Sequence, residues 1–144
     1  KDPAKYTTAL THMDSAIANK PGFADAHNYR GIVLRQLDRQ DEARTAYEAA
    51  LELAAGHSEA HVNLGNLHYL AGNMEGALMS YRNALHYSPG LHSIHHNVGA
   101  ILLSLPLTEA SKAEARTHLQ RAVAIEPDRA DSAKLLKMLD AQSD

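Results

Sequence analysis

A 34-residue period runs through the chain and leaves few folds open to it. Gly31, Gly65 and Gly99 are spaced 34 residues apart. The same interval relates other columns, which are Ala9, Ala43 and Ala77; Ala16, Ala50 and Ala84; and His27, His61 and His95. A fixed period of this length is the signature of a repeat architecture, in which each unit buries its apolar face against its neighbours.

Each repeat has the pattern of two helices. The segments at 24–37 and 58–72 have apolar residues at helical spacing and no interior proline, and the segments at 40–54 and 73–87 follow them with the same periodicity. A short turn, Gly72–Asn73, separates the helices of one repeat, and SPGL and EPDR interrupt the chain after the second helix. The pattern therefore predicts an all-α fold.

The middle repeat resembles one known family. The residues that carry the resemblance are His61, Leu64, Gly65, His68, Ala77, Tyr81, Ala84 and Pro89. In this order they follow the tetratricopeptide repeat pattern of a large residue, Leu-Gly, an aromatic, Ala, an aromatic, Ala and Pro. The resemblance covers nearly the whole chain and implies a right-handed superhelix of stacked antiparallel helix pairs, whose concave groove binds extended peptides. Arg30 departs from the pattern by replacing a leucine, and one interpretation is that Tyr29 turns inward instead.

The repeat register divides the chain. We predict a single domain over 1–144, made of a half repeat (4–20), three repeats (24–57, 58–91 and 92–129) and a C-terminal capping helix (130–141). The third repeat carries four extra residues within 104–112, where Pro106 ends a helix and Ser111 with Glu114 is expected to form a capping box. Lys137 occupies the glycine column of the last helix, which favours a solvated cap; an array cut at this end is the alternative. The half repeat and the absence of an initial methionine suggest that the native protein continues upstream.

The first helices of the repeats have two opposite faces. Successive residues turn by about 100° around a helix, so the glycine stripe packs inward and the opposite stripe, here called the groove stripe, is free. Candidate peptide-binding residues on the groove stripe and its flanks are Asn28, Tyr29, Ile32, Arg35, Asn63, Asn66, Tyr69, Leu70, His96, Asn97 and Leu103.

Asparagines and apolar residues carry the binding hypothesis. Asn63 and Asn97 occupy equivalent places, and an amide that both donates and accepts can pair with any peptide backbone. Ile32, Tyr69, Leu70 and Leu103 are candidate apolar anchors. Solvated asparagines, and apolar residues packed under a neighbouring helix, are the alternative interpretation. The groove stripe has no lysine in the three repeats, which disfavours a clamp for acidic tails.

The remaining residues exclude several classes of function. No nucleotide-binding loop, metalloprotease motif or serine-hydrolase motif is present, so we expect neither catalysis nor a cofactor. A net charge of −3 disfavours nucleic acid, and no apolar run approaches the roughly 20 residues of a membrane span. We therefore predict a soluble scaffold for a protein or peptide, with the cytoplasm favoured. The alternatives are a self-associating, homo-oligomeric assembly element and a histidine-based metal module.

The metal alternative depends on two histidine pairs. His57 with His61, and His92 with His96, have the i,i+4 spacing that can bring two imidazoles to one ion. Both pairs lie at helix starts, where the helix dipole disfavours cations, and no cysteine or well-placed carboxylate completes a ligand set. We therefore expect no metal site.

Overall fold

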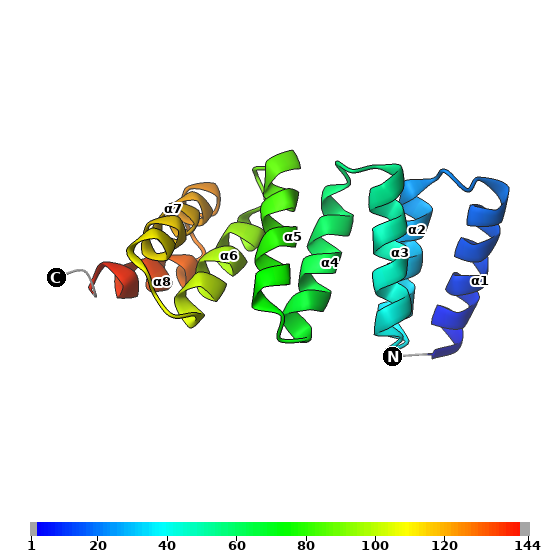
Figure 1. Cartoon of the computed structure of the whole chain (residues 1–144), viewed down its shortest axis with the longest axis horizontal. Helices are drawn as coiled ribbons and strands as arrows, with labels where there is room; N and C mark the ends of the chain where they lie inside the picture. Colours follow the sequence, from blue (N-terminus) through cyan, green and yellow to red (C-terminus); the bar gives the residue numbers. More distant parts are fainter. Residues whose placement is uncertain (1–2, 142–144) are drawn as a thin grey trace. The chain divides into compact units, whose positions relative to one another are not determined.

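The computed structural model describes residues 3–141, which form helices joined by short turns (Figure 1). The helices are α1 (Pro3–Asn19), α2 (Ala24–Gln36), α3 (Gln40–Leu53), α4 (Ser58–Leu70), α5 (Met74–Tyr87), α6 (His92–Ser104), α7 (Glu109–Ile125) and α8 (Ala130–Asp140). No strand occurs within residues 3–141. The predicted all-α fold is confirmed, and the predicted helix ends differ from those observed by only one or two residues.

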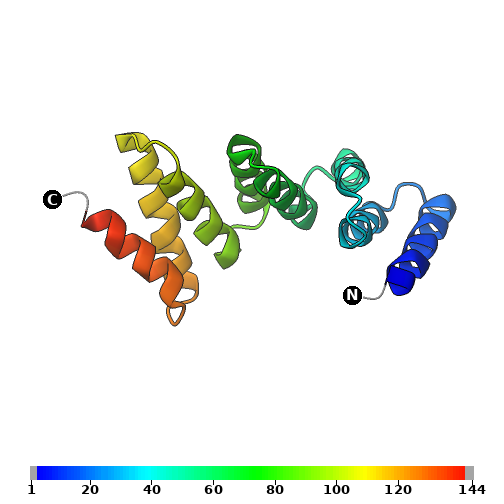
Figure 2. The ribbon, with the colours of Figure 1, turned by 90° about the horizontal axis from the view of Figure 1, so that it is seen from below.

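The helices belong to two compact units. Unit 1 ends at Tyr87 and contains α1 to α5, and unit 2 begins at Ser88 and contains α6 to α8. In unit 1, α2 packs beside α3 and α4 beside α5, as Figure 2 shows. In unit 2, α7 packs against both α6 and α8. The predicted single domain and its repeat boundaries remain predictions.

The glycine column brings the helices of each pair close together. A Cβ atom on Gly65 would lie 2.6 Å from Cε1 of Tyr81, and one on Gly31 would lie 2.5 Å from Cε1 of Tyr47. Both rings are buried, with 0% of Tyr47 and 1% of Tyr81 exposed. Each ring therefore rests directly on a glycine backbone, because any side chain there would occupy the space of the ring. The predicted packing role of this column is confirmed.

The histidine column fastens each first helix to the turn before it. The Nε2 atoms of His27, His61 and His95 each lie within hydrogen-bond distance of a carbonyl oxygen six residues upstream. These oxygens belong to Pro21, Ala55 and Pro89, at 3.1, 2.9 and 3.0 Å. Because a carbonyl only accepts, Nε2 must carry the hydrogen in each case. The recurring histidine thus has a structural role in the turn.

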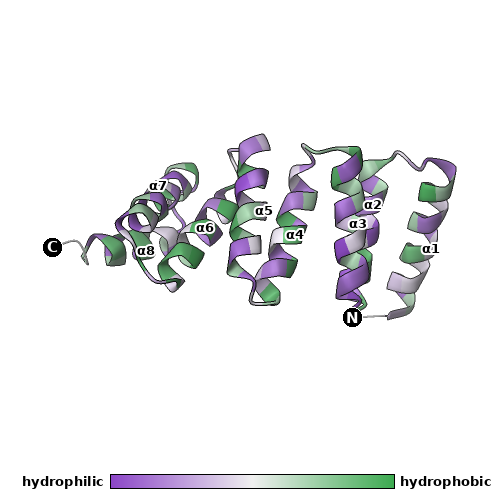
Figure 3. Cartoon of the chain, in the orientation of Figure 1, coloured by the Kyte–Doolittle hydropathy of each residue, from purple (hydrophilic) through white to green (hydrophobic). Residues whose placement is uncertain are grey.

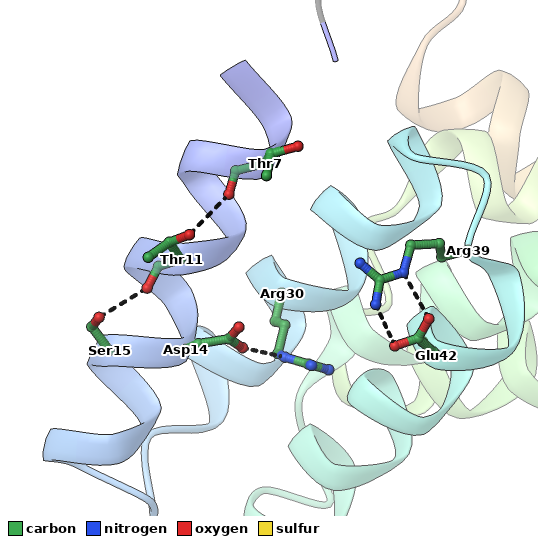
Figure 4. Close-up of polar contacts among 7 residues, drawn as sticks. All are labelled: Thr7, Thr11, Asp14, Ser15, Arg30, Arg39 and Glu42. Carbon is green, nitrogen blue, oxygen red and sulfur yellow. Dashed lines mark hydrogen bonds and ion pairs between the residues drawn. The ribbon is translucent and has the colours of Figure 1, made fainter. Parts of the chain in front are cut away.

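An ion pair explains the departure from the family pattern at Arg30. Nε of Arg30 on α2 lies 2.7 Å from Oδ1 of Asp14 on α1 (Figure 4). The threonine and serine hydroxyls of α1 bond to backbone carbonyls within that helix, as Thr11 does to the carbonyl of Thr7 at 3.2 Å. Tyr29 is 52% exposed, so the interpretation that it turns inward in place of Arg30 is wrong. The arginine instead links the first full repeat to the half repeat.

The inserted segment of unit 2 ends at a helix cap that differs from the expected one. Thr108 Oγ1 accepts from the Ser111 N–H at 3.1 Å, and Ser111 Oγ accepts from the Thr108 N–H at 2.9 Å. The predicted box of Ser111 with Glu114 is wrong because α7 already begins at Glu109. Leu105, which follows α6, is extended with ψ of 166°, as expected of a residue before proline.

Hydrophilic and hydrophobic residues are interspersed along each helix, as Figure 3 shows. Such mixing is typical of helices that bury one side and leave the other in water. Among residues 3–141, no helix is long and apolar enough to cross a bilayer.

Candidate functional site

The exposed part of the groove stripe in unit 1 lies on α2 and α4. Tyr29 is 52% exposed, Tyr69 50% and Leu70 63%, so these three apolar surfaces are accessible to a partner. Ile32 behaves differently, because it is half-buried and packs against the core cluster that includes Leu34 and Tyr47. Of the predicted apolar anchors in this unit, the side chains of Tyr69 and Leu70 are therefore the available ones.

A buried amide holds Asn63 in place. Nδ2 of Asn63 donates to Oδ1 of Asn28 at 3.0 Å, and Nδ2 of Asn28 donates to Oε2 of Glu59 at 3.3 Å. Asn28 is 0% exposed. The prediction that Asn28 contacts a peptide is wrong, because the side chain lies between α2 and α4 and offers no surface. The role of Glu59 in this network was not predicted, since only its place on the groove stripe was visible in the sequence.

Asn66 is held by a second buried group. The hydroxyl of Tyr81, whose side chain is 1% exposed, donates to Oδ1 of Asn66 at 2.7 Å. This bond leaves the Nδ2 hydrogens of Asn66 for another acceptor, whereas Asn63 keeps its Oδ1 for another donor. Residues three apart are neighbours on a helix surface. The two half-buried amides of α4 therefore present an acceptor and a donor side by side, which matches the N–H and C=O groups of a peptide backbone.

We expect Asn66→Ala to lower the free energy of unfolding by about 1–3 kcal/mol, because it leaves the buried Tyr81 hydroxyl without its acceptor. Urea denaturation followed by circular dichroism measures this loss. Tyr81→Phe in the same background removes the hydroxyl that has lost this acceptor and should recover part of the stability. If the losses of the two single variants simply add in the double variant, the inferred hydrogen bond is wrong.

Arg35 lies at the edge of the same unit. The side chain is half-buried, and its Nε has no acceptor within residues 3–141. Burial raises the pKa of the Tyr47 hydroxyl, and the positive charge of Arg35 opposes that rise in pKa. The arginine thus acts on the core of its own repeat, and a contact with a ligand stays a prediction.

Two pockets of unit 2 contain the other predicted residues. Asn97 and His96 line a polar pocket of about 170 Å³ together with Arg129 and Asp131. Nδ1 of His96 lies 2.9 Å from Oγ of the buried Ser132. Burial lowers the pKa of His96, whereas the negative charge of Asp131 opposes this. Leu103 lines a separate, apolar pocket between α6 and α8. A ladder that joins Asn63 in unit 1 to Asn97 in unit 2 stays a prediction.

The paired histidines have separate partners. Nδ1 of His57 accepts from the N–H of Ala60 at 3.2 Å, and its Nε2 lies 3.0 Å from Oδ1 of Asp25. His57 thereby caps α4, while the ring of His61 contacts the turn before it. Within the described part of the chain, no three histidine or carboxylate side chains are grouped to hold a metal ion.

The chain is similar to known proteins in sequence and in fold. The family model described as "Tetratricopeptide repeat" matches residues 4–58 and 35–91. A DnaJ protein P58IPK homolog of Arabidopsis thaliana is 30% identical over 79 residues, which are 55% of this chain and 16% of that protein. Anaphase-promoting complex subunit 7 of Dictyostelium discoideum is 28% identical over 131 residues, which are 91% of this chain and 22% of that protein. The chain thus spans about a fifth of the length of these relatives.

Solved structures share the fold at low sequence identity. MamA has a TM-score of 0.78 at 12% identity, over 94% of this chain and 72% of its own. YrrB, described as a TPR protein with an unusual peptide-binding site, has a TM-score of 0.81 at 21% identity, over 91% of this chain and 66% of its own. At such identities the likeness shows a common arrangement of helices and nothing about ligands.

Proposed function

The chain belongs to the tetratricopeptide repeat family, and from this premise we propose that it is a non-catalytic scaffold that binds an extended peptide or protein segment along its groove stripe. Repeat arrays of this kind use their extended surfaces for binding other proteins. The observation that carries the proposal is the pair of amides on α4. Asn63 is held by buried Asn28 and Asn66 by buried Tyr81.

Pre-organised amides favour backbone recognition. A free asparagine loses rotamer freedom when it binds, whereas Asn63 and Asn66 have already been ordered by partners inside the protein. Pairing with backbone N–H and C=O groups is insensitive to the side chains of the ligand, so selectivity must come from neighbouring surfaces. Tyr29, Tyr69 and Leu70 supply such surfaces beside the amides.

Replacement of Asn63 and Asn97, which occupy equivalent places in successive repeats, is expected to weaken peptide binding roughly tenfold or more, because each lost hydrogen bond contributes about 0.5–1.5 kcal/mol. Asn66 is kept in this variant because it also accepts from the buried Tyr81 hydroxyl. The test uses peptides selected from a random display library on the immobilised chain, with affinities measured for the Asn63→Ala, Asn97→Ala double variant. Because Asn63 also bonds to buried Asn28, the melting temperature is recorded to establish that the variant is folded at the assay temperature.

A matched control separates the groove from a general loss of asparagine. Asn19 and Asn83 are exposed and lie off the groove stripe, on α1 and α5. Asn19→Ala with Asn83→Ala should leave peptide affinity unchanged. If the folded Asn63→Ala, Asn97→Ala variant binds the peptides undiminished, pairing of Asn63 and Asn97 with the peptide backbone is rejected.

A further inference from the structure

An apolar pocket of about 270 Å³ opens in unit 2 between α6 and α8. Ala100 and Leu103 of α6, Leu107 of the inserted segment, and Leu135 and Met138 of α8 contribute to its lining. Met138 is 51% exposed at its rim. The volume is below the roughly 300–1,000 Å³ of pockets that bind cofactors or drug-sized molecules, and it exceeds the roughly 150 Å³ that accommodates one benzene. It therefore suits one large aliphatic side chain.

A small residue on the groove stripe creates this pocket. Ala100 occupies the repeat position that holds Asn66 and Ile32 in the two preceding repeats, 34 and 68 residues earlier. The methyl group of alanine leaves space that a longer side chain would fill. Leu135 and Met138 then complete the lining from α8, which the sequence had indicated only as a solvated cap. The pocket thus lies on the same stripe of α6 that carries Asn97.

The surface beside the pocket is positively charged. Lys134 and Lys137 are exposed on α8, and together with Met138 they line an adjoining shallow hollow. Lys134 precedes Met138 by one helical turn, so the two side chains are neighbours on the helix surface. Neither lysine forms an ion pair within residues 3–141. Asp140, an acidic residue of the same helix, is engaged by Arg116 at 3.0 Å.

We propose that this pocket and the two lysines bind a peptide segment of a partner protein in which a leucine- or methionine-sized side chain stands next to a carboxylate. The aliphatic side chain enters the pocket and gains from burial of apolar surface. The carboxylate lies over Met138, within reach of Lys134 and Lys137. This proposal rests on the proposed function, because it takes the natural ligand to be a peptide.

The methionines of the chain provide a direct test. The sequence contains four, so methyl-¹³C methionine labelling yields a spectrum of few signals. The probe is N-acetyl-L-leucine, which carries the side chain and the carboxylate together. Its neutral amide lacks the carboxylate charge, and N-acetylglycine lacks the aliphatic side chain. The methyl signal of Met138 should shift with N-acetyl-L-leucine, shift less with the amide and stay in place with N-acetylglycine. Met79, which is 61% exposed on α5, is the internal control and should not respond.

Two sets of variants separate the pocket from the charges. Ala100→Leu fills the pocket and should abolish the shift of Met138; the isoleucine at the equivalent Ile32 indicates that the fold accommodates an aliphatic side chain at this position. Lys134→Gln with Lys137→Gln should weaken binding of N-acetyl-L-leucine about two- to fivefold and leave binding of the amide unchanged, as expected for exposed ion pairs.

Several outcomes would overturn the proposal. The proposal is wrong if the Met138 methyl signal does not shift with N-acetyl-L-leucine, or if the Met79 signal shifts equally. It is also wrong if the Met138 shift persists in Ala100→Leu, or if N-acetyl-L-leucine and its amide bind equally well. A Met138 signal that moves with protein concentration alone would mean that a second copy of the chain occupies the pocket instead. The Asn63→Ala, Asn97→Ala variant should still show the N-acetyl-L-leucine response, so failure of backbone pairing and failure of this pocket are distinguishable.

Discussion

Replacement of Tyr81 by alanine is expected to lower the free energy of unfolding by about 3–5 kcal/mol, as is typical of large aromatic residues removed from a core. The ring is 1% exposed and lies on the backbone of Gly65, where helices α4 and α5 meet. Its hydroxyl also holds Asn66. The variant therefore leaves a cavity at the contact that defines the helix pair, and removes a support of the groove stripe at the same time.

The matched control is Tyr69→Ala. Tyr69 lies on α4 as well, but half of its surface is exposed, so its removal should change the free energy of unfolding by no more than about 0.5 kcal/mol. Urea denaturation measures both variants, and amide hydrogen exchange shows whether protection is lost first in α4 and α5. Equal destabilisation by the two variants would mean that the contact between Tyr81 and Gly65 does not hold the pair together.

Acidification is expected to destabilise the chain through the histidines of unit 2. Burial lowers the pKa of His95, and the nearby positive charges of Arg121 and His92 lower it further, against the hydrogen bond from its Nε2 to the Pro89 carbonyl. Burial likewise lowers the pKa of His96. Above the ordinary histidine pKa of 6.5, both imidazoles are neutral in the folded chain and in the unfolded chain. Below it the unfolded chain binds protons that the folded chain refuses, so stability decreases as the pH falls.

Geometry explains why His95 resists a proton. Its Nε2 hydrogen is directed to the carbonyl of Pro89, so Nδ1 is the remaining acceptor, and this atom lies 2.8 Å from Nδ1 of His118. His118 must therefore donate in this contact. A proton added to Nδ1 of His95 would set two N–H groups against each other. The other ring nitrogen of His118, Nε2, lies 3.8 Å from Oε1 of Glu114.

The measurement is the free energy of unfolding between about pH 7.5 and pH 5.5. Each proton taken up only by the unfolded state contributes a slope of at most about 1.4 kcal/mol per pH unit. His95→Gln with His96→Gln should flatten the slope, whatever its effect on absolute stability. An unchanged slope in this variant would assign the acid sensitivity to other groups.

The repeat pattern predicted those features of the fold that are set within one pair of helices. The glycine column was correctly assigned to the packed face of the first helices, because a residue without Cβ lets the paired helix come close. The structure adds that the rings of Tyr47 and Tyr81 occupy this space. The helix ends were predicted to within one or two residues, since turn residues and proline interrupt the chain locally. Lys137 indicated an exposed position in α8, and the structure places it at the surface.

The candidate site was predicted less completely, because its residues depend on contacts between successive repeats. Asn28 and Asn63 both appeared on or beside the groove stripe, yet Asn28 is buried and Asn63 is half-buried. Asn28 is the fifth residue of its repeat and Asn63 the sixth, so the two positions lie about 100° apart around the helix axis. The periodicity placed Asn28 on a flank of the groove stripe, but it did not show that the neighbouring helix covers this flank. Leu135 and Met138 were missed because α8 was considered only as the end of the array, either a solvated cap or a cut, and not as part of the groove lining.

The sequence by itself determined the repeat, the all-α fold and the place of the glycine column on the packed face of the first helices, because periodicity and side-chain size act within a helix and its immediate partner. The tertiary structure alone decided which polar groups became partners and where space was left. Asn28 with Glu59, Tyr81 with Asn66, and the apolar pocket beneath Met138 all arise where side chains from different helices converge. Such convergence depends on the mutual rotation of helices, which packing of the whole unit sets.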